Sequence, residues 1–365
     1  MTAPLPPTLH FPYPDIPEPG RMIDVAPGIW WLRMPLPFAL DHINLWLLAD
    51  RIDGVEGWTA IDCGYGNAAT RALWDIHFSQ NFRGLPLLRV IATHYHPDHL
   101  GNAAWLLERC TGDRLLWATQ SEFQTAHLVW NQLVQFRMED SAAFFRRHGM
   151  PDEAVKHHAA RGNLYRGAVP ELPQRYRRIV GGDVLEINGR RWATIIGLGH
   201  APEHASFHCR ELNVLISGDM LLPKISTNVS VWANDPEGDP LKLFLDSIAR
   251  YTELPDDALV LPSHGLPFIG IRARVRALAD HHRDRLVELQ SAAAVPVTAH
   301  ALLPVLFRRT LDVQQQFFAM GEAIAHLNHL WHHGRLQRAV CGDGVIRFSN
   351  IPHQEQECPQ QSHPT

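Results

Sequence analysis

The stretch THYHPDHLG at residues 93–101 is the most informative part of the sequence for the fold class. Within it, three histidines and one aspartate lie a few positions apart: His94, His96, Asp98 and His99. The stretch follows an apolar run, LRVIAT at residues 88–93, that is typical of a buried strand. Side chains that follow a strand lie at one rim of a sheet, where loops carry functional groups. Zinc and its neighbouring metals favour imidazole and carboxylate ligands, so the stretch predicts a metal site rather than a polar loop with surface histidines.

Three further strand ends each present one side chain that can bind a metal. His200 follows IIGLG, Asp219 follows VLISG, and His264 follows LVLPS. Each of these residues alone is weak evidence for a metal site, because a lone histidine at a strand end is usually an ordinary hydrogen-bonded residue. Together they predict that successive strands deliver ligands to the same rim as residues 93–101.

The motif H-x-H-x-D-H, followed by a distant His, an Asp and a last His, resembles the signature of the metallo-β-lactamase superfamily. The resemblance covers about residues 22–290. It implies a four-layer αβ/βα sandwich, an α/β fold in which two sheets pack face to face with helices outside. It also implies that His94, His96 and His200 hold one metal, that Asp98, His99 and His264 hold another, and that Asp219 bridges them. The expected cofactors are two Zn²⁺ ions, with iron or manganese as alternatives.

Strand and helix patterns support two halves of similar order. Apolar runs predict strands at residues 29–32, 43–48, 58–61, 88–93 and 115–118 in the first half, with helices at 67–78 and 100–109. The second half has strand patterns at 191–196, 206–209, 214–217 and 258–261, with helices at 241–251 and 271–290. Residues 121–178, rich in Arg and His, are expected to form a helical insert between the halves.

The ends of the chain have their own patterns. Residues 1–20 are expected to form a proline-rich arm, and residues 21–292 the catalytic domain. In residues 296–350, a short helix ending near Phe307, a longer helix at 314–332 and a hairpin around residues 341–344 resemble a winged-helix module. Residues 351–365 are expected to be a disordered tail.

The complete ligand set narrows the expected activity. True β-lactamases of the superfamily lack the bridging Asp219, persulfide dioxygenases use fewer ligands, and flavodiiron proteins carry a flavodoxin domain that is not apparent here. The tail resembles the lactamase-β-like subgroup, which includes glyoxalase-II-like hydrolases and an endoribonuclease. We therefore expect a hydrolase of a thioester or a carboxylic ester or lactone, with a metal-bridging hydroxide as nucleophile.

Two other functions remain open. An endoribonuclease or phosphodiesterase of the same fold would use Arg335, Arg338 and Arg347 to bind phosphates, but the basic residues are few and Asp343 lies among them. A non-catalytic binding module of this fold would have no need of all seven ligands. A panel of thioesters, lactones, phosphodiesters and RNA separates these interpretations.

Two residues beside the ligands are candidates for catalysis. Asp98 is expected to orient the hydroxide and accept its proton as well as bind a metal. His204 is expected either to orient a ligand or to touch substrate, and a buried hydrogen-bonded role is equally open. The loop GHAPEHAS at residues 199–206 departs from the family pattern, because Glu203 stands where a small residue is usual. That departure predicts a carboxylate near the metals.

Charged and histidine-rich segments allow a functional and a structural interpretation. In the insert, basic side chains could recognise an anionic thioester, or they could form a solvated face: Arg137, Arg146, Arg147 and Lys156. The spacing of His326, His329 and His333 places them on one helix, where a surface location is expected.

Composition limits the remaining possibilities. The chain has 365 residues and a formal net charge of −5, which argues against a protein that coats nucleic acid. No apolar run approaches the roughly 20 residues of a membrane-spanning helix, and the N-terminus does not resemble a signal peptide. The five cysteines show no paired spacing. These features predict a cytoplasmic protein acting on a small molecule, with an oligomeric state that the sequence does not reveal.

Overall fold

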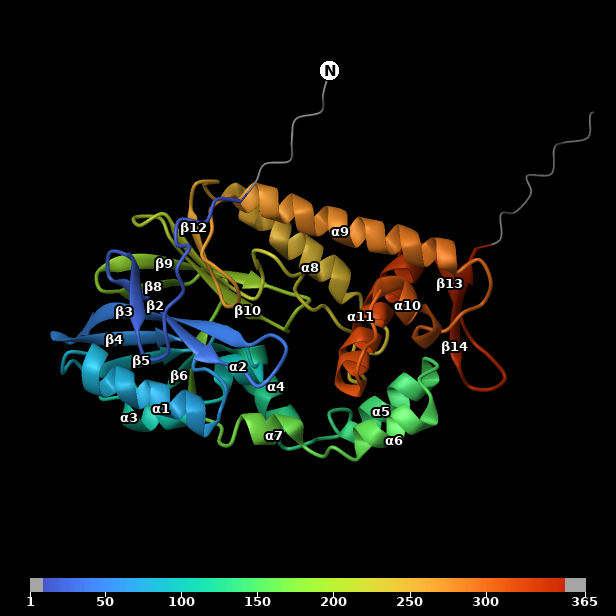
Figure 1. Ribbon diagram of the computed structural model, residues 1–365, viewed down its shortest axis with the longest axis horizontal. Coiled ribbons are helices and arrows are strands. Elements are labelled where there is room, and N and C mark those ends of the chain that lie inside the picture. The colour runs from blue at the N-terminus through green and yellow to red at the C-terminus, as the bar shows by residue number, and fades with distance from the viewer. Residues whose placement is uncertain (1–8, 352–365) are drawn as a thin grey trace, which may run out of the picture.

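Two β-sheets form the centre of the computed structural model, which describes residues 9–351 (Figure 1). The first sheet has the spatial order β1 (Met22–Ala26), β2 (Ile29–Pro35), β3 (His42–Ile52), β4 (Val55–Ile61), β5 (Leu87–Ile91), β6 (Leu116–Thr119) and β7 (Tyr176–Ile179). The second has the order β12 (Leu259–Pro262), β11 (Val214–Gly218), β10 (His204–Cys209), β9 (Arg190–Gly197) and β8 (Val184–Ile187).

The sheets pack face to face because their strands are apolar on both sides. In β3, Trp46 and Leu48 face the second sheet, whereas Leu45 and Leu47 belong to the core on the outer side. In β11, Ile216 packs between the sheets. This period of two, with both faces buried, explains why these strands have nearly continuous apolar sequences. The predicted αβ/βα sandwich is confirmed.

Helices cover both outer faces. The first sheet carries α1 (Ala68–Ile76), followed by the π-helical turn η1 (His77–Asn81), and α3 (Ala103–Arg109); the second carries α8 (Pro240–Arg250), its 3-10 extension η2 (Tyr251–Glu253) and α9 (Ile271–Ala292). The helix predicted at residues 100–109 is divided, because α2 (Pro97–Leu100) ends before α3 begins. A Cβ at Gly101 would lie 2.4 Å from the backbone nitrogen of Gly66, so this close approach admits only glycine.

The insert is shorter than predicted. Four helices lie between β6 and β7: α4 (Gln120–Trp130), α5 (Met138–Arg147), α6 (Asp152–Ala159) and α7 (Leu164–Ala168). The prediction of helix up to residue 178 is wrong at its end, because β7 pairs in parallel with β6 and extends the first sheet. The edge strand β7 has little apolar alternation and β8 is only four residues long, which explains why they were not predicted.

The C-terminal elements share a hydrophobic core with the second sheet. The predicted short helix is a 3-10 turn, η3 (His300–Leu302), followed by α10 (Leu303–Leu306). The predicted long helix is α11 (Val313–His332), and β13 (Leu336–Val340) pairs with β14 (Ile346–Asn350) as the predicted hairpin. Met320, Ile324 and Leu327 of α11 are buried in the same core as α8 and α9.

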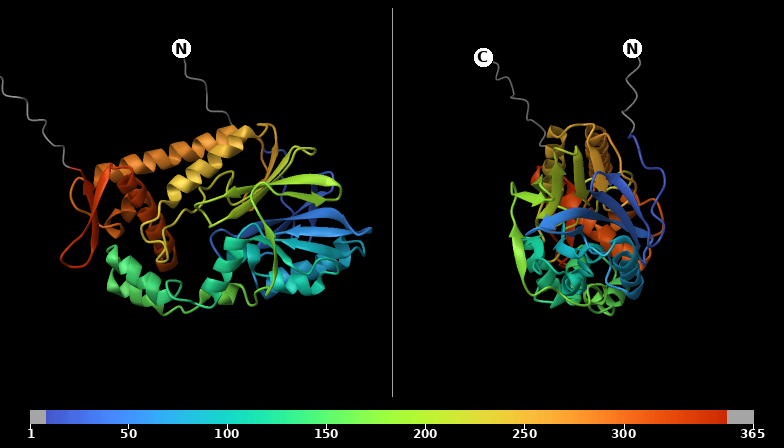
Figure 2. Two further views of the ribbon diagram at one scale, coloured as in Figure 1. Left: turned by 180° about the vertical axis from the view of Figure 1, so that it is seen from behind. Right: turned by 90° about the vertical axis from the view of Figure 1, so that its left-hand side faces the viewer.

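Helix α9 connects the sandwich with the C-terminal elements, which lie at the same end of the molecule as α5 and α6 (Figures 1 and 2). Of the predicted proline-rich arm, residues 9–20 are described, and His10 pairs with Ile269. The expected tail lies outside the described residues, except for residue 351. Within residues 9–351, no helix is long and apolar enough to cross a membrane.

Candidate metal centre

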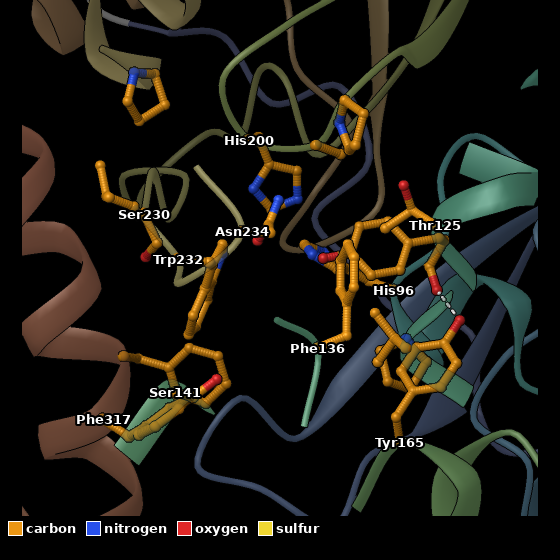
Figure 3. A pocket seen from close by; sticks show the side chains of 18 of the residues that line it. His96, Thr125, Phe136, Ser141, Tyr165, His200, Ser230, Trp232, Asn234 and Phe317 are labelled. Carbon is orange, nitrogen blue, oxygen red and sulfur yellow. Dashed lines mark hydrogen bonds between the residues drawn. The ribbon is translucent and has the colours of Figure 1, made fainter. Parts of the chain in front are cut away.

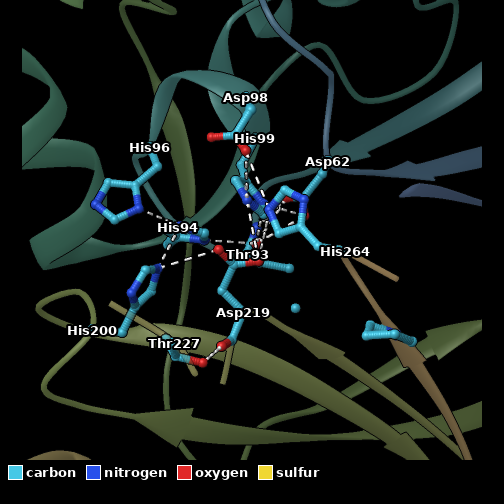
Figure 4. Close-up of polar contacts among 12 residues, drawn as sticks. Asp62, Thr93, His94, His96, Asp98, His99, His200, Asp219, Thr227 and His264 are labelled. Atoms are coloured by element: carbon cyan, nitrogen blue, oxygen red, sulfur yellow. Dashed lines mark hydrogen bonds and ion pairs between the residues drawn. The ribbon is translucent and has the colours of Figure 1, made fainter. Parts of the chain in front are cut away.

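All seven predicted ligands come together at one rim of the sandwich (Figure 4). The loop from β5 through α2 carries His94, His96, Asp98 and His99. Three other strand ends deliver the rest: His200 follows β9, Asp219 follows β11 and His264 follows β12. Their ligand atoms form three groups, each within 4.8 Å: His94, His96 and His200; His94, His99 and Asp219; Asp98, His99 and His264.

The first group consists of three imidazoles. His94 Nε2 lies 2.8 Å from His96 Nδ1 and 3.2 Å from His200 Nε2. Two nitrogens bound tetrahedrally to one zinc are separated by about 3.3 Å. The spacing therefore suits a shared cation.

The second group combines a carboxylate with two imidazoles. Asp98 Oδ2 lies 3.4 Å from His264 Nε2 and 3.6 Å from His99 Nε2. Nitrogen and oxygen donors in such a set are typical of zinc and of other first-row metals.

Asp219 lies between the two groups. Its Oδ1 is 3.5 Å from the Nε2 atoms of His99 and His264, and its Oδ2 is 3.5 Å from His200 Nε2. One carboxylate oxygen therefore faces each group, which is the arrangement that a bridging ligand requires.

Three of the ligand histidines are held by a hydrogen bond from the ring nitrogen that faces away from the centre, Nδ1. His99 Nδ1 donates to Asp62 Oδ2 at 2.7 Å, His200 Nδ1 to the Asn228 carbonyl at 2.7 Å, and His264 Nδ1 to the His42 carbonyl at 2.8 Å. These bonds leave the Nε2 lone pairs facing the centre, as metal ligation requires.

Asp62 was missed by the sequence analysis. Besides His99, its buried carboxylate accepts hydrogen bonds from the backbone nitrogen and the hydroxyl of Thr93. It follows β4 directly, so the same rule that identified the other strand-end residues would have found it.

Two buried atoms of the centre lack a hydrogen-bond partner among the described residues. They are His99 Nε2 and Asp219 Oδ1, which face each other at 3.5 Å. An unsatisfied buried polar group costs about 1–3 kcal/mol. A cation at this position satisfies both atoms, so the residues fit a metal centre.

Burial and the neighbouring carboxylates together set the charge of the ligand histidines. Together with the neighbouring histidines, burial lowers the pKa of His94 well below its usual value, and burial lowers the pKa of His96 to about 3. Burial also acts to lower the pKa of His264, but Asp219 and Asp98 outweigh it and raise that pKa to about 10. His94 and His96 are therefore neutral and ready to bind metal at pH 7, whereas His264 must release a proton to do so.

His204 lies behind the ligands. Its Nε2 accepts a hydrogen bond from the backbone nitrogen of Asp219 at 3.1 Å, and its ring lies 4.9 Å from that of His94. The side chain is fully buried, and a Cβ at Gly218 would lie 2.2 Å from its Nε2. This position fits the orientation of a ligand rather than contact with substrate.

Glu203 does not place a carboxylate toward the ligands, so that prediction is wrong. Its Oε2 accepts from the backbone nitrogen of Ser121, at the start of α4. The buried Glu122 connects the loop that carries His94 and His96 with the loop that carries His200. Its carboxylate accepts hydrogen bonds from the backbone nitrogens of Tyr95 and Glu203 at 2.9 and 2.6 Å. Burial raises the pKa of Glu122 to about 7.

A cavity of about 630 Å³ opens beside the ligands (Figure 3). His96 and His200 lie in its wall, together with side chains of the insert and of α11, among them Phe136, Tyr165 and Phe317. It has the size of small-molecule sites in enzymes. No local sequence pattern predicts it, because its walls come from distant segments.

The four basic side chains of the insert that were candidates for an anion-binding lid are exposed: Arg137, Arg146, Arg147 and Lys156. Arg137 pairs with Asp140 and Arg146 with Asp152 on the surface. The four basic residues that could have formed an anion-binding lid are absent from the cavity wall. The solvated-face interpretation therefore holds.

The histidines of α11 differ from the expected surface set. His326 is fully buried, and its Nε2 lies 3.1 Å from Nδ1 of the equally buried His282 in α9. His329 is half-buried and lies 3.0 Å from Asp239, whereas His333 is exposed. A surface location is thus wrong for His326, because α11 turns this residue toward α9 in the shared core.

The family of the chain follows from comparison with known proteins. Residues 40–264 match the metallo-beta-lactamase superfamily, and residues 286–351 match the metallo-beta-lactamase-like, C-terminal domain. The chain belongs to the metallo-beta-lactamase superfamily, and it is a metal-dependent hydrolase.

Particular relatives agree with this assignment. A beta-lactamase domain protein from Burkholderia ambifaria is 47% identical, with a TM-score of 0.88 over 94% of this chain and 98% of that one. A metallo-beta-lactamase family protein from Thermus thermophilus is 30% identical, with a TM-score of 0.74 over 90% and 100% of the two chains. The probable metallo-hydrolase YqjP of Bacillus subtilis (strain 168) is 26% identical over 309 residues, which is 82% of this chain and 91% of YqjP.

Proposed function

We propose that the chain is a dinuclear metal hydrolase that cleaves a thioester or a carboxylic ester, including a lactone. The observation that carries this proposal is Asp219, whose two oxygens face two separate ligand groups at 3.5 Å. The first group would be His94, His96 and His200, and the second Asp98, His99 and His264. Two Zn²⁺ ions fit these nitrogen and oxygen donors, with iron or manganese as alternatives.

Metal ions in such a pair lower the pKa of water to near neutrality and polarise a carbonyl oxygen. The residues of the chain supply position and proton transfer. Asp98 has a partly exposed carboxylate beside both His99 and His264, so it can orient the attacking water and accept its proton. His204 and Asp62 hold Asp219 and His99 in place.

Hydrolysis joins the water oxygen to the carbonyl carbon and breaks the bond from that carbon to oxygen or sulfur. The proton taken from water ends on the leaving alcohol or thiol. No oxidant or further reactant is needed. The largely apolar cavity beside His96 and His200 supports a small organic substrate.

The nuclease alternative has less support. Arg338 pairs with Glu237, Arg347 with Asp343, and the guanidinium of Arg335 contacts Gln290. Two of the three arginines that could bind phosphate are thus already neutralised. The substrate range is therefore expected to exclude RNA.

Metal analysis combined with a substrate panel tests the proposal. Purified protein should contain about two metal ions per chain and should cleave thioesters, esters or lactones but not phosphodiesters or RNA. The variant Asp219→Ala should lose metal and turnover together. RNA cleavage that falls steeply with added salt, and that disappears on Arg335→Ala combined with Arg338→Ala, would instead establish the nuclease.

A further inference from the structure

Several exposed apolar side chains line the cavity beside the metal ligands. Phe318, Leu243, Phe38 and Leu164 are between 42% and 47% exposed, and all four lie in its wall. Large apolar side chains gathered at one exposed place, rather than scattered, mark a binding site. Water in contact with this surface is displaced favourably by an apolar group.

Three distant parts of the chain meet at one end of the cavity. The loop after β11 contributes Trp232, α5 contributes Ser141, and α11 contributes Phe317 (Figure 3). The rings of Trp232 and Phe317 lie 5.5 Å apart, and that of Phe145 lies 4.5 Å from Phe317. Phe145 of the insert and Trp232 thus both contact Phe317 of the C-terminal helix, and these aromatic contacts form the end of the cavity near α11.

Charge is scarce in the cavity wall. Apart from the histidine ligands, only Arg161 and Asp235 among the described wall residues carry a formal charge. The other members are apolar, aromatic or neutral polar side chains. A wall of this kind discriminates by apolar area and shape and offers little to a highly charged substrate.

We propose that the substrate carries a flexible apolar chain next to the bond that is cleaved, and that this chain occupies the cavity. This inference rests on the proposed ester or thioester hydrolysis and specifies its substrate class. The scissile carbonyl lies at His96 and His200, and the chain extends toward Trp232 and Phe317. The insert and the C-terminal helix thus select the substrate, whereas the strand ends of the sandwich hold the metals.

Two series of esters test the proposal on the metal-loaded enzyme. One lengthens the acyl group from 4-nitrophenyl acetate to the decanoate, and the other lengthens the alcohol from ethyl to decyl acetate. Burial of each methylene contributes about 0.8 kcal/mol, so kcat/KM should rise up to about fourfold per methylene until the cavity is full. The series that rises identifies the side of the scissile bond on which the chain lies.

Variants show whether this cavity is responsible. Ser141→Phe fills space in the wall and should flatten the rise with chain length. Ala143→Phe adds the same ring on the exposed side of the same helix, so the rise should persist. Phe318→Ser removes a half-exposed wall residue without disturbing the core, and it should also reduce the rise.

Binding measured without turnover separates the two proposals. Straight-chain alkanoates from acetate to decanoate, titrated calorimetrically into the metal-loaded enzyme, should bind more tightly as the chain lengthens, and Ser141→Phe should abolish that trend. If the trend appears while no ester, thioester or lactone is cleaved, the cavity assignment stands and the proposed function fails. If esters are cleaved with no dependence on chain length in either series, or if Ser141→Phe and Ala143→Phe behave alike, the apolar-chain proposal is overturned.

Discussion

Replacing Asp62 tests how the protein holds its metal ligands. The Asp62 carboxylate accepts hydrogen bonds from His99 Nδ1 and from the Thr93 nitrogen, both at 2.7 Å, and all three residues are buried. Asp62→Ala leaves two buried N–H donors unpaired, whereas the Thr93 hydroxyl keeps His94 Nδ1 as a neighbour at 3.1 Å. At about 1–3 kcal/mol for each lost partner, the free energy of unfolding should fall by about 2–6 kcal/mol. Loss of this support for His99 should also weaken metal binding by about 10- to 100-fold.

Urea unfolding and chelator competition measure the two effects separately. Asp62→Asn retains one side-chain oxygen as a hydrogen-bond acceptor, so its losses of stability and of metal affinity should be smaller than those of Asp62→Ala. Asp50→Asn is the matched control, because Asp50 is equally buried and pairs with Arg89 at 2.6 Å, away from the metal ligands. The control should lose stability but keep its metal affinity. Wild-type metal affinity in Asp62→Ala, or an equal loss in Asp50→Asn, would refute the role given to Asp62.

Three further predictions concern catalysis, the bridge and pH. Asp98→Asn should retain about one metal per chain, because the first ligand group is intact, and turnover should fall by about 10² or more; near-normal turnover with both metals bound would contradict its role. Asp219→Ala should lower the occupancy of both sites in elemental analysis, and loss of one metal alone would count against a bridge. Burial lowers the pKa of His326 to about 4 and that of His282 to about 3, so both are neutral when folded but take up protons when unfolded below about pH 6.5. Each of these histidines should therefore lower the free energy of unfolding by about 2 kcal/mol between pH 7 and pH 5. In His326→Gln, the loss of stability measured by urea unfolding over this pH range should be smaller by about that amount.

Local patterns predicted most of the central strands and the candidate ligands at their ends, whereas the four-layer sandwich and the grouping of the ligands were implied by the resemblance to the superfamily. Several strands end in a polar side chain that can bind metal. The buried strand β5 and the histidines after it are neighbours in the sequence, so a single short stretch shows both. The same rule, applied to the end of β4, would have included Asp62. Edge strand β7 was placed in the helical insert, because an edge strand with little apolar alternation leaves only a weak pattern.

Features that depend on distant segments could not be predicted in this way. The break between α2 and α3 falls at Asn102, whose side chain donates to the carbonyl of the distant Tyr65 at 2.8 Å. The direction of Glu203 depends on the start of α4, and the burial of His326 depends on the packing of α11 against α9. The cavity combines the sandwich, the insert and the C-terminal helix, so its apolar character is a property of the tertiary structure alone.

The proposed function depends above all on Asp219 bridging two metal ions. Anomalous X-ray diffraction from crystals of the metal-loaded protein, recorded at the metal absorption edges, locates the metals without reference to activity. Two anomalous peaks about 3.5–4 Å apart are expected, each about 2.0–2.2 Å from a different oxygen of Asp219. A single peak at His94, His96 and His200, with Asp98, His99 and His264 bound to nothing, would contradict the bridge.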